Sequence, residues 1–213
     1  ALIFLVLVFR FLEQPTLLSL PFSSTKLTLS PIFFWPLAVF VMVGTVNAVN
    51  LTDGMDGLAA GASLITITTF CLIGSGTCAP YIAGMVAAII GFLWYNSYPA
   101  EIFMGDTGAF ALGGFIATAA IVARGEVYLP LLGGLFVLES LSIMIQVGYY
   151  KTTGERVFKI SPLHHHFESA EGIDYEYLLP KVEWSEPKVA ARLLTVHLVL
   201  AGIGLLGYFI GLN

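Results

Sequence analysis

The chain has 213 residues, 57% of them hydrophobic and 11% charged, and its mean hydropathy of +0.88 is far above that of ordinary water-soluble domains. The formal net charge of −5, without a basic stripe interleaved with aromatic residues, argues against nucleic-acid binding. Apolar segments that cross a bilayer must form helices or closed barrels, and these segments lack the period-two alternation of barrel strands. The composition therefore predicts an all-α, polytopic transmembrane helical bundle, with residues 1–213 as a single transmembrane domain.

The N-terminal part combines an apolar segment with a polar one. Ala1 to Phe11 is predicted to be a partial membrane helix, because no initiator Met or basic segment precedes it and no small-residue cleavage site follows it. We expect earlier helices to lie upstream of this sequence. Glu13 to Ser30 is rich in Pro, Ser and Thr, which predicts a surface loop with a short hairpin.

Six further segments each approach the roughly 20 apolar residues needed to cross a hydrocarbon layer of ~30 Å. We expect them to be complete membrane helices that, with the partial N-terminal helix, make up the bundle. They are Pro31 to Asn47, Gly57 to Ile73, Ala79 to Tyr95, Gly108 to Ala123, Val127 to Tyr150 and Ala191 to Leu212. Cys71 and Cys78 flank one of the turns, and a disulfide is compatible with their spacing, but we interpret both as small apolar residues.

The basic residues predict how the bundle is oriented. Six of the nine Lys and Arg residues lie in or beside the long loop at residues 151–190, and the positive-inside rule places that loop in the cytoplasm. These six are Lys151, Arg156, Lys159, Lys181, Lys188 and Arg192. Counting helices backwards, the loops at residues 47–57 and 96–108 emerge on the same side, and the turn at Arg124 to Glu126 emerges on the other.

Two of the cytoplasmic loops carry aspartates beside glycines. The loop at residues 47–57 contains Asp53 and Asp56, and the loop at residues 96–108 contains Asp106. No basic residue is near them, and unpaired carboxylates at the hydrocarbon boundary are costly. Hard oxygen ligands suit Mg²⁺, which takes one or two carboxylates together with substrate phosphates, and helices that begin at the ends of both loops would direct their N-terminal amides at an anion. The pattern predicts a magnesium and diphosphate site.

Each part of this site also has a purely structural explanation. Asp53 and Asp106 could serve as helix N-caps. Asn47 and Asn50 could cap a helix end or form a hydrogen bond between helices. Phe103 could be an anchor at the membrane interface or a stacking platform for a base. These explanations apply to the residues one at a time, whereas the site hypothesis explains why they occur together on one face.

Three consecutive histidines, His164 to His166, lie in the third cytoplasmic loop. Consecutive side chains point in different directions, so the three cannot all serve a core. Accessible imidazoles can bind phosphate, sugar hydroxyls or a metal, and a structural metal site is the alternative, although no Cys or nearby Asp completes its ligand set. In the preceding helix, Gln146 is expected to face the site, and Glu139, which lies deeper, is expected to pair within the bundle.

Three motifs, in this order along the chain, resemble those of the phospho-N-acetylmuramoyl-pentapeptide transferase family, which belongs to the polyprenyl-phosphate N-acetylhexosamine 1-phosphate transferases. They are Asn47-Ala48-Val49-Asn50-Leu51-Thr52-Asp53-Gly54-Met55-Asp56-Gly57-Leu58, Phe103-Met104-Gly105-Asp106 and Pro162-Leu163-His164-His165-His166-Phe167-Glu168. The resemblance implies transfer of phospho-N-acetylmuramoyl-pentapeptide from its UDP-linked precursor to undecaprenyl phosphate. The products are UMP and lipid I, a precursor for bacterial peptidoglycan synthesis and hence for cell shape and cell division. The histidine motif has the form that distinguishes the muramoyl enzymes.

The resemblance also implies roles for individual residues. Asp106 is expected to be a magnesium ligand, and Asp53 a catalytic residue or second metal ligand, so that the two form the catalytic pair. The residues expected to contact the substrate are Asn50, Asp56, Asn96, Phe103 beside the uracil, Gln146, His165 and His166. The implied location is the bacterial cytoplasmic membrane, multi-pass, with the active site facing the cytoplasm and membrane lipid around the bundle. A homodimer and contacts with other cell-wall synthesis enzymes are further hypotheses.

Two departures from the family pattern qualify these expectations. The family carries an Asp-Asp-x-x-Lys motif on an earlier loop, and this sequence contains none, so we expect residues 1–213 alone to lack transferase activity. The acidic segment at residues 168–183 is longer than expected and is either a solvated loop or a docking patch. Outside the family, the alternatives are a transporter or channel, or a non-catalytic structural fragment. The clustering of acids at one membrane face disfavours a transport pathway.

Overall fold

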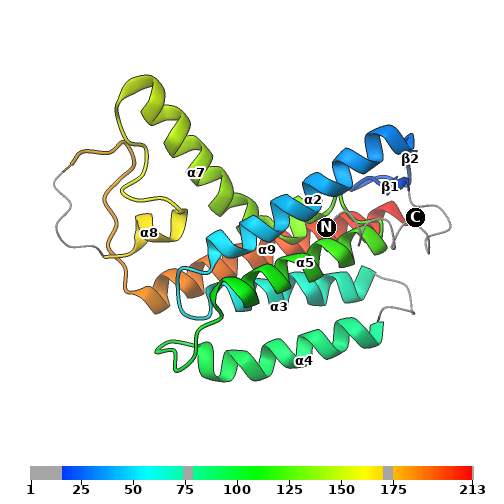
Figure 1. Ribbon diagram of the computed structural model, residues 1–213, viewed down its shortest axis with the longest axis horizontal. Coiled ribbons are helices and arrows are strands. Elements are labelled where there is room, and N and C mark those ends of the chain that lie inside the picture. Colours follow the sequence, from blue (N-terminus) through cyan, green and yellow to red (C-terminus); the bar gives the residue numbers. More distant parts are fainter. Residues whose placement is uncertain (1–15, 74–78, 170–174, 213) are drawn as a thin grey trace.

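The computed structural model describes residues 16–73, 79–169 and 175–212, and these residues are mostly α-helical (Figure 1). Within them, five helices lie side by side as one bundle. They are α2 (Pro31–Thr52), α3 (Leu58–Ile73), α4 (Ala79–Asn96), α5 (Gly105–Val122) and α9 (Glu186–Gly211). The expectations for Ala1 to Phe11, for Cys78 and for residues 170–174 of the acidic segment fall outside the described residues.

The helices of the bundle are apolar on most of their surface, as is typical of helices that face other helices or a bilayer. α2 packs most extensively against α5, while α3 packs against both α4 and α9. Gly113 of α5 allows the closest approach, since an added Cβ there would lie 2.6 Å from the Cα of Val46 in α2. This close packing brings the C-terminal end of α2 beside the N-terminal end of α5, where the predicted aspartates lie.

Three of the described helices are long and apolar enough to cross a membrane, namely α2, α5 and α9. Leu58–Ile73 of α3 and Pro80–Asn96 of α4 are apolar but shorter, and the expected number of about six complete spans is not confirmed. The mostly helical architecture, with helices that could span a membrane, is confirmed. The expected helix boundaries agree with α2 to α5 and α9 to within a few residues, except that α2 continues to Thr52 and α9 begins at Glu186.

The expectation of one helix over Val127 to Tyr150 is wrong. The chain instead forms a short helix, α6 (Leu129–Leu132), and then α7 (Gly134–Thr153), with a break at Gly133. Two consecutive glycines have low helix propensity and allow this change of direction. Beyond the break, Figure 1 shows α7 projecting away from the other helices. α7 ends at Gly154, which has a left-handed φ of 76° and donates its N–H to the carbonyl of Tyr150.

Buried side chains from α3 and α9 satisfy backbone groups at this break. Thr66 Oγ1 donates to the Leu132 carbonyl at 2.9 Å, and the Leu135 N–H donates to His197 Nδ1 at 3.2 Å. Because Nδ1 accepts, the neutral His197 ring carries its proton on Nε2, which lies 3.0 Å from Thr66 Oγ1. A broken helix at membrane depth requires partners of this kind. His197 and Thr66 therefore hold α3, α7 and α9 together at the point where α7 turns outward.

A short antiparallel hairpin precedes the bundle, which confirms the hairpin expected before Ser30. It consists of β1 (Leu17–Ser19) and β2 (Lys26–Thr28), with Leu18 opposite Leu27. The segment between the strands packs on the bundle, because the Phe22 N–H donates to the Gly207 carbonyl of α9 at 3.0 Å. The hairpin thus covers one end of the bundle.

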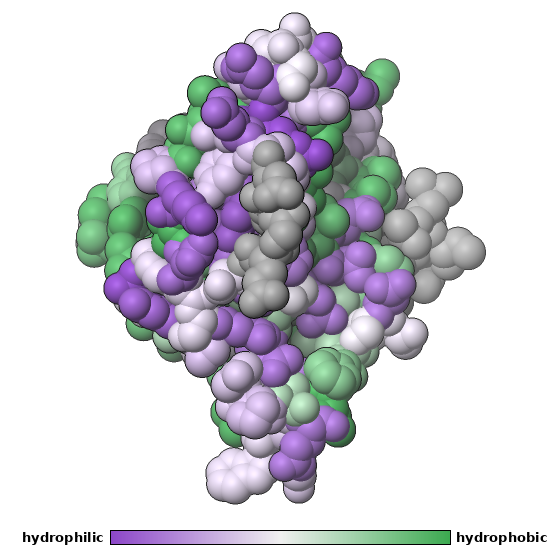
Figure 2. Space-filling view, turned by 90° about the vertical axis from the view of Figure 1, so that its left-hand side faces the viewer, coloured by the Kyte–Doolittle hydropathy of each residue, from purple (hydrophilic) through white to green (hydrophobic). Residues whose placement is uncertain are grey.

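The predicted site loops all lie at the opposite end. Figure 1 shows the α2–α3 turn, the α4–α5 turn and the segment that carries the short helix α8 (Leu163–Phe167) together there. Figure 2 views this end directly and shows hydrophilic side chains gathered over it, with hydrophobic side chains along the flanks. The three polar clusters that topology predicts on one face are therefore on one end of the molecule.

Candidate functional site

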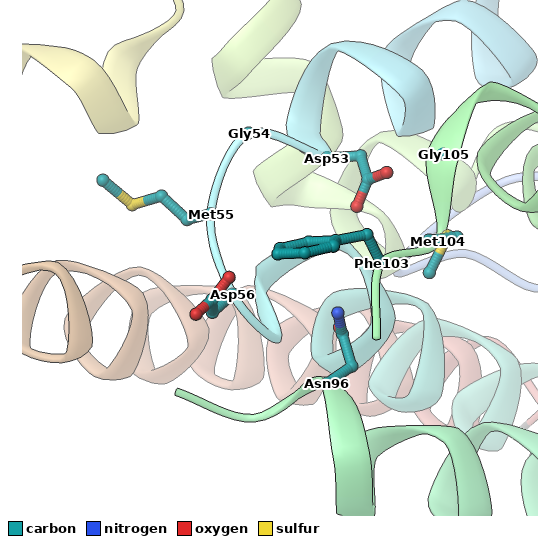
Figure 3. A pocket seen from close by; sticks show the side chains of 8 residues that line it. All are labelled: Asp53, Gly54, Met55, Asp56, Asn96, Phe103, Met104 and Gly105. Carbon is teal, nitrogen blue, oxygen red and sulfur yellow. The ribbon is translucent and has the colours of Figure 1, made fainter. Parts of the chain in front are cut away.

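A pocket of about 240 Å³ lies between the α2–α3 turn and the α4–α5 turn. Figure 3 shows that both predicted aspartate loops contribute to its wall. The lining residues are Asp53, Gly54, Met55, Asp56, Asn96, Phe103, Met104 and Gly105. Two loops that are separated in sequence by two helices thus form a single concave site.

Asp53 and Asp106 approach each other where α2 ends and α5 begins. Asn50 links the two loops, because its Nδ2 donates to Asp106 Oδ1 at 2.9 Å. Asp53 is half-buried, and its pKa is raised, first by burial and then by the negative charge of Asp106. The two carboxylates therefore repel each other, an arrangement that a cation would stabilise.

The explanation of these aspartates as helix N-caps is wrong. Asp53 follows the last turn of α2 as its C-cap, so it lies at the negative end of that helix dipole. Asp106 lies inside the first turn of α5, and the N-cap residue is Met104, which makes no side-chain capping bond. For Asn50, the alternative of a hydrogen bond between helices is confirmed by its contact with Asp106.

Asp56 ties three chain segments together beside the pocket. Its Oδ2 accepts the N–H of Ala100 from the α4–α5 turn at 2.8 Å. Its own N–H donates to Glu186 Oε1 at 2.9 Å. Glu186 begins α9, and our sequence reasoning gave it no role. The signal available for it was a glutamate before a proline at a helix start, which is common and points to no particular partner.

Asn96 closes the floor of the pocket. It is 4% exposed, its Oδ1 accepts the Gly57 N–H at 3.2 Å, and its Nδ2 donates to the Ile102 carbonyl at 2.9 Å. Gly57 has a φ of +73°, which explains why glycine stands at the start of α3. Asn96 thus fixes both loops, and its amide groups are already used within the protein.

Phe103 is 77% exposed and stands at the pocket mouth. In Figure 3 its ring projects across the pocket between the Asp53 carboxylate and the Asn96 amide. An exposed aromatic face beside carboxylates is suited to stacking on a flat, polar ligand group such as a base. The exposure of Phe103 is equally compatible with the alternative of an anchor at the membrane interface.

The three histidines occupy different environments. His164 and His166 are 0% and 2% exposed, while His165 is accessible and its Nδ1 lies 3.1 Å from Glu168 Oε2. The expectation of a water-accessible histidine surface is therefore wrong for two of the three. Glu139 of α7 is fully buried and contacts His164 of α8, so its partner comes from the histidine segment and not from within the bundle as expected.

His166 is held as a neutral ring inside the loop at residues 151–190, called the histidine loop below. It packs edge-on against Phe158, Phe167 and Tyr177, and its Nδ1 accepts the Lys159 N–H at 3.1 Å. Burial, and then the nearby charge of Lys159, lower the pKa of His166. Since Nδ1 accepts, the remaining proton is assigned to Nε2, which leaves this atom as a donor.

Gln146 secures the chain as it returns from α7. Its Oε1 accepts the N–H groups of Val157 at 3.1 Å and Phe158 at 2.9 Å, and its side chain is buried. It does not line the pocket. In the part of the chain that the structure describes, no group of three or more His, Cys, Asp and Glu side chains is arranged to hold a metal ion. Any metal here would need ligands from a substrate or water as well.

Comparison with known proteins identifies the family of this chain. Residues 1–124 match the family model described as glycosyl transferase family 4. The chain is 44% identical over 211 residues to the phospho-N-acetylmuramoyl-pentapeptide-transferase of Thermodesulfovibrio yellowstonii, a match that covers 90% of this chain and 55% of the relative. It is 45% identical over 213 residues to the same-named protein of Rubrobacter xylanophilus, covering 96% of this chain and 61% of the relative. For that of Desulforamulus reducens, identity is 46% over 195 residues, covering 88% and 54%.

These matches, with a helical membrane-type fold and a carboxylate-lined pocket at one end, define a membrane-embedded transferase class. The chain belongs to glycosyl transferase family 4. Among curated proteins, its similarity is to phospho-N-acetylmuramoyl-pentapeptide-transferases, and it spans 54% to 61% of the length of the three relatives named.

Proposed function

We propose that this chain forms the nucleotide-sugar site of an enzyme that transfers phospho-N-acetylmuramoyl-pentapeptide from its UDP-linked precursor to undecaprenyl phosphate, giving lipid I and UMP. The observation that carries the proposal is a pocket lined by Asp53 and by the exposed Phe103, with the negative charge of Asp106 acting on Asp53 from beside the lining. The names of the similar proteins support phospho-N-acetylmuramoyl-pentapeptide as the transferred group.

The residues fit a magnesium ion that is shared with a diphosphate. Asp106 and Asp53 supply two hard carboxylates, and Mg²⁺ commonly takes one or two from the protein and completes its shell with phosphate and water oxygens. After burial, the negative charge of Asp106 raises the pKa of Asp53, and this repulsion between the two carboxylates supports a cation beside them. When bound, Mg²⁺ would neutralise the diphosphate and stabilise UMP as a leaving group.

The remaining residues would bind and orient the substrate for in-line displacement. An oxygen of the lipid phosphate attacks the sugar-linked phosphorus, and the bond from that phosphorus to the UMP oxygen breaks. Phe103 would stack on the uracil, while Asn50 and Asp56 hold the loops in place around the diphosphate. His165 presents an accessible ring nitrogen to the substrate.

We assign the free ring nitrogen of His165 as a hydrogen-bond acceptor because of the contact of this ring with Glu168. With Nδ1 held against the Glu168 carboxylate, the neutral ring carries its proton there and offers Nε2 as an acceptor. His166, by contrast, would donate from Nε2 to a substrate group that contacts this atom. Gln146 would act indirectly, by shaping the loop that carries both rings. Substrate hydroxyls and phosphate oxygens could thus be distinguished by neighbouring residues.

We also propose that the pocket faces the cytoplasm of a bacterium, because six of the nine basic residues accompany the histidine loop. Turnover would require an Asp-Asp-x-x-Lys loop like that of the family, and these 213 residues contain no such motif. A lipid I assay on residues 1–213 alone would refute that requirement if it showed full turnover.

The exchange of labelled UMP into the UDP-linked precursor tests the assignment, in membranes that contain the full-length protein, undecaprenyl phosphate and Mg²⁺. Asp53→Asn and Asp106→Asn should each lower exchange at least about 100-fold, the scale on which loss of one charge-stabilising group acts. Glu101→Gln, an exposed carboxylate in the same α4–α5 turn, is the matched control and should leave exchange unchanged. If neither aspartate substitution lowers exchange, the proposed site is wrong.

A further inference from the structure

Glu139 of α7 and His164 of α8 form a fully buried contact behind the pocket, and both are 0% exposed. Glu139 Oε2 lies 3.2 Å from His164 Nδ1 and accepts the backbone N–H of His164 at 3.3 Å. Neither residue lines the pocket, so neither is placed to touch a ligand there. Within the described residues, the second carboxylate oxygen and both ring nitrogens of His164 have no hydrogen-bond partner, so the ring meets Glu139 through a charge contact and not through a hydrogen bond.

Such burial is costly, because an acidic group with an unpartnered oxygen loses its hydration without full compensation. An apolar pair of similar volume would hold two helices together at least as well. The contact therefore calls for an explanation beyond stability.

The other side of the His164 ring meets the aspartate loop. Nε2 of His164 is so close to Gly54 that any Cβ at position 54 would overlap it. Gly54 lies in the short turn between Asp53 and Asp56 and itself lines the pocket. Contacts thus run without interruption from the α7 carboxylate, through the imidazole, to the backbone of the turn that carries both pocket aspartates.

We infer that Glu139 and His164 are positioning residues that set the placement of the Asp53 turn relative to the histidine loop. Glu139 fixes the imidazole by holding both its ring and its backbone N–H, and the imidazole limits how far the turn at Gly54 can move. The role rests on the proposed function, since it assigns to these residues the alignment of Asp53 with the reacting phosphate. His165, on the next position of the same helix, is oriented by the same anchor.

The inference predicts an effect on kcat more than on KM. A displacement of about 1 Å at a reacting group can cost about 100-fold in rate, whereas ligand contacts elsewhere in the pocket are retained. Glu139→Leu should lower kcat for UMP exchange by about 10- to 100-fold, with KM for the UDP-linked precursor changed by less than about threefold. Glu139→Gln retains an oxygen acceptor for the His164 N–H and should restore most of the rate.

Gly54→Ala gives an independent route to the same defect, because its methyl group would displace the imidazole. It should lower kcat, and the matched Gly148→Ala should not, since a Cβ at position 148 of α7 meets no atom within 4 Å. The decisive comparison is the double variant Gly54→Ala, His164→Ala. Removal of the ring creates space for the methyl group, so the combined loss should be clearly smaller than the product of the two single losses.

The outcomes separate the two proposals. If the wild type is active, two results overturn the positioning role alone. One is a double variant whose loss of kcat equals the product of the Gly54→Ala and His164→Ala losses, and the other is a Glu139→Leu variant that keeps its kcat. A wild-type protein without UMP exchange overturns the proposed function and the positioning role with it. Thermal unfolding of each variant, measured alongside, distinguishes a loss of kcat in folded protein from a loss of folded protein.

Discussion

At the scale of single residues, burial divides side chains that look equivalent in the sequence. His164, His165 and His166 are adjacent, yet one contacts a buried glutamate, one is accessible and one lies in an aromatic cluster. A five-residue helix turns consecutive side chains by about 100° each, so they meet different surroundings. Their identity could be predicted to matter, but their separate environments depend on Glu139 and Phe158, which only the folded chain brings near.

Glu126 is a second buried acid, at the far end of the bundle from the pocket. It is 4% exposed, and neither carboxylate oxygen has a hydrogen-bond partner in the described residues. Burial raises its pKa to about 7, against smaller opposing contributions from its own backbone N–H and from Arg124. The folded protein therefore holds this proton more tightly than the unfolded chain does.

This difference predicts a pH dependence of stability. An acid whose pKa is raised on folding favours the folded state below its unfolded pKa, and that advantage is lost as the pH rises from about 4.5 toward 7. Glu126→Gln should equal the wild type near pH 4.5 and be more stable above pH 7, by up to roughly 3 kcal/mol. Thermal unfolding across this range in one detergent measures the difference, and Glu155→Gln, an exposed acid, is the control. A stability difference between the Glu126→Gln variant and the wild type that stays the same at every pH would refute the prediction.

At the scale of elements, the break between α6 and α7 determines the shape of the site. The long apolar run at residues 127–150 predicts one straight helix, since glycines within such a run are tolerated. The break is stabilised from outside the run, by Thr66 of α3 and His197 of α9. A sequence pattern local to one segment cannot reveal partners that come from two others.

Thr66→Val tests how much this break depends on its side-chain partners. The substitution keeps the shape of Thr66 but removes the hydroxyl that donates to the Leu132 carbonyl and lies beside His197. The Leu132 carbonyl would lose this donor, whereas His197 Nε2 keeps its contact with the Ala62 carbonyl at 3.1 Å. A buried polar group left without a partner costs about 1–3 kcal/mol. Thr68→Val is matched to it on the same helix, where the exposed hydroxyl bonds only to the Leu64 carbonyl of its own helix, and it should cost less than about 0.5 kcal/mol. Equal melting temperatures for the two variants would show that the hydroxyl of Thr66 does not stabilise the break.

At the scale of the whole molecule, the sequence predicts a helical membrane architecture and the convergence of three polar loops. Both follow from long-range regularities: apolar runs give the helices, and alternating turns place every second loop at the same end. The aspartate pair is also predictable from the sequence, because carboxylates without a nearby basic residue are rare beside apolar segments. Contacts such as that of Asp56 with Glu186 could not be predicted, since they join segments with no shared pattern.

The central claim is that Asp53, Phe103 and Asp106 bind a magnesium-coordinated nucleotide sugar. Isothermal titration of the UDP-linked muramoyl-pentapeptide into the full-length purified protein tests it most directly, with Mg²⁺ and with EDTA in its place. The predicted result is saturable binding whose affinity falls at least about tenfold when EDTA replaces Mg²⁺, a loss of about 1.4 kcal/mol or more of binding free energy. Asp106→Asn with Mg²⁺ should lose affinity to a similar degree. Glu101→Gln should bind like the wild type. Equal affinity with and without Mg²⁺, or unchanged affinity in Asp106→Asn, would contradict the account.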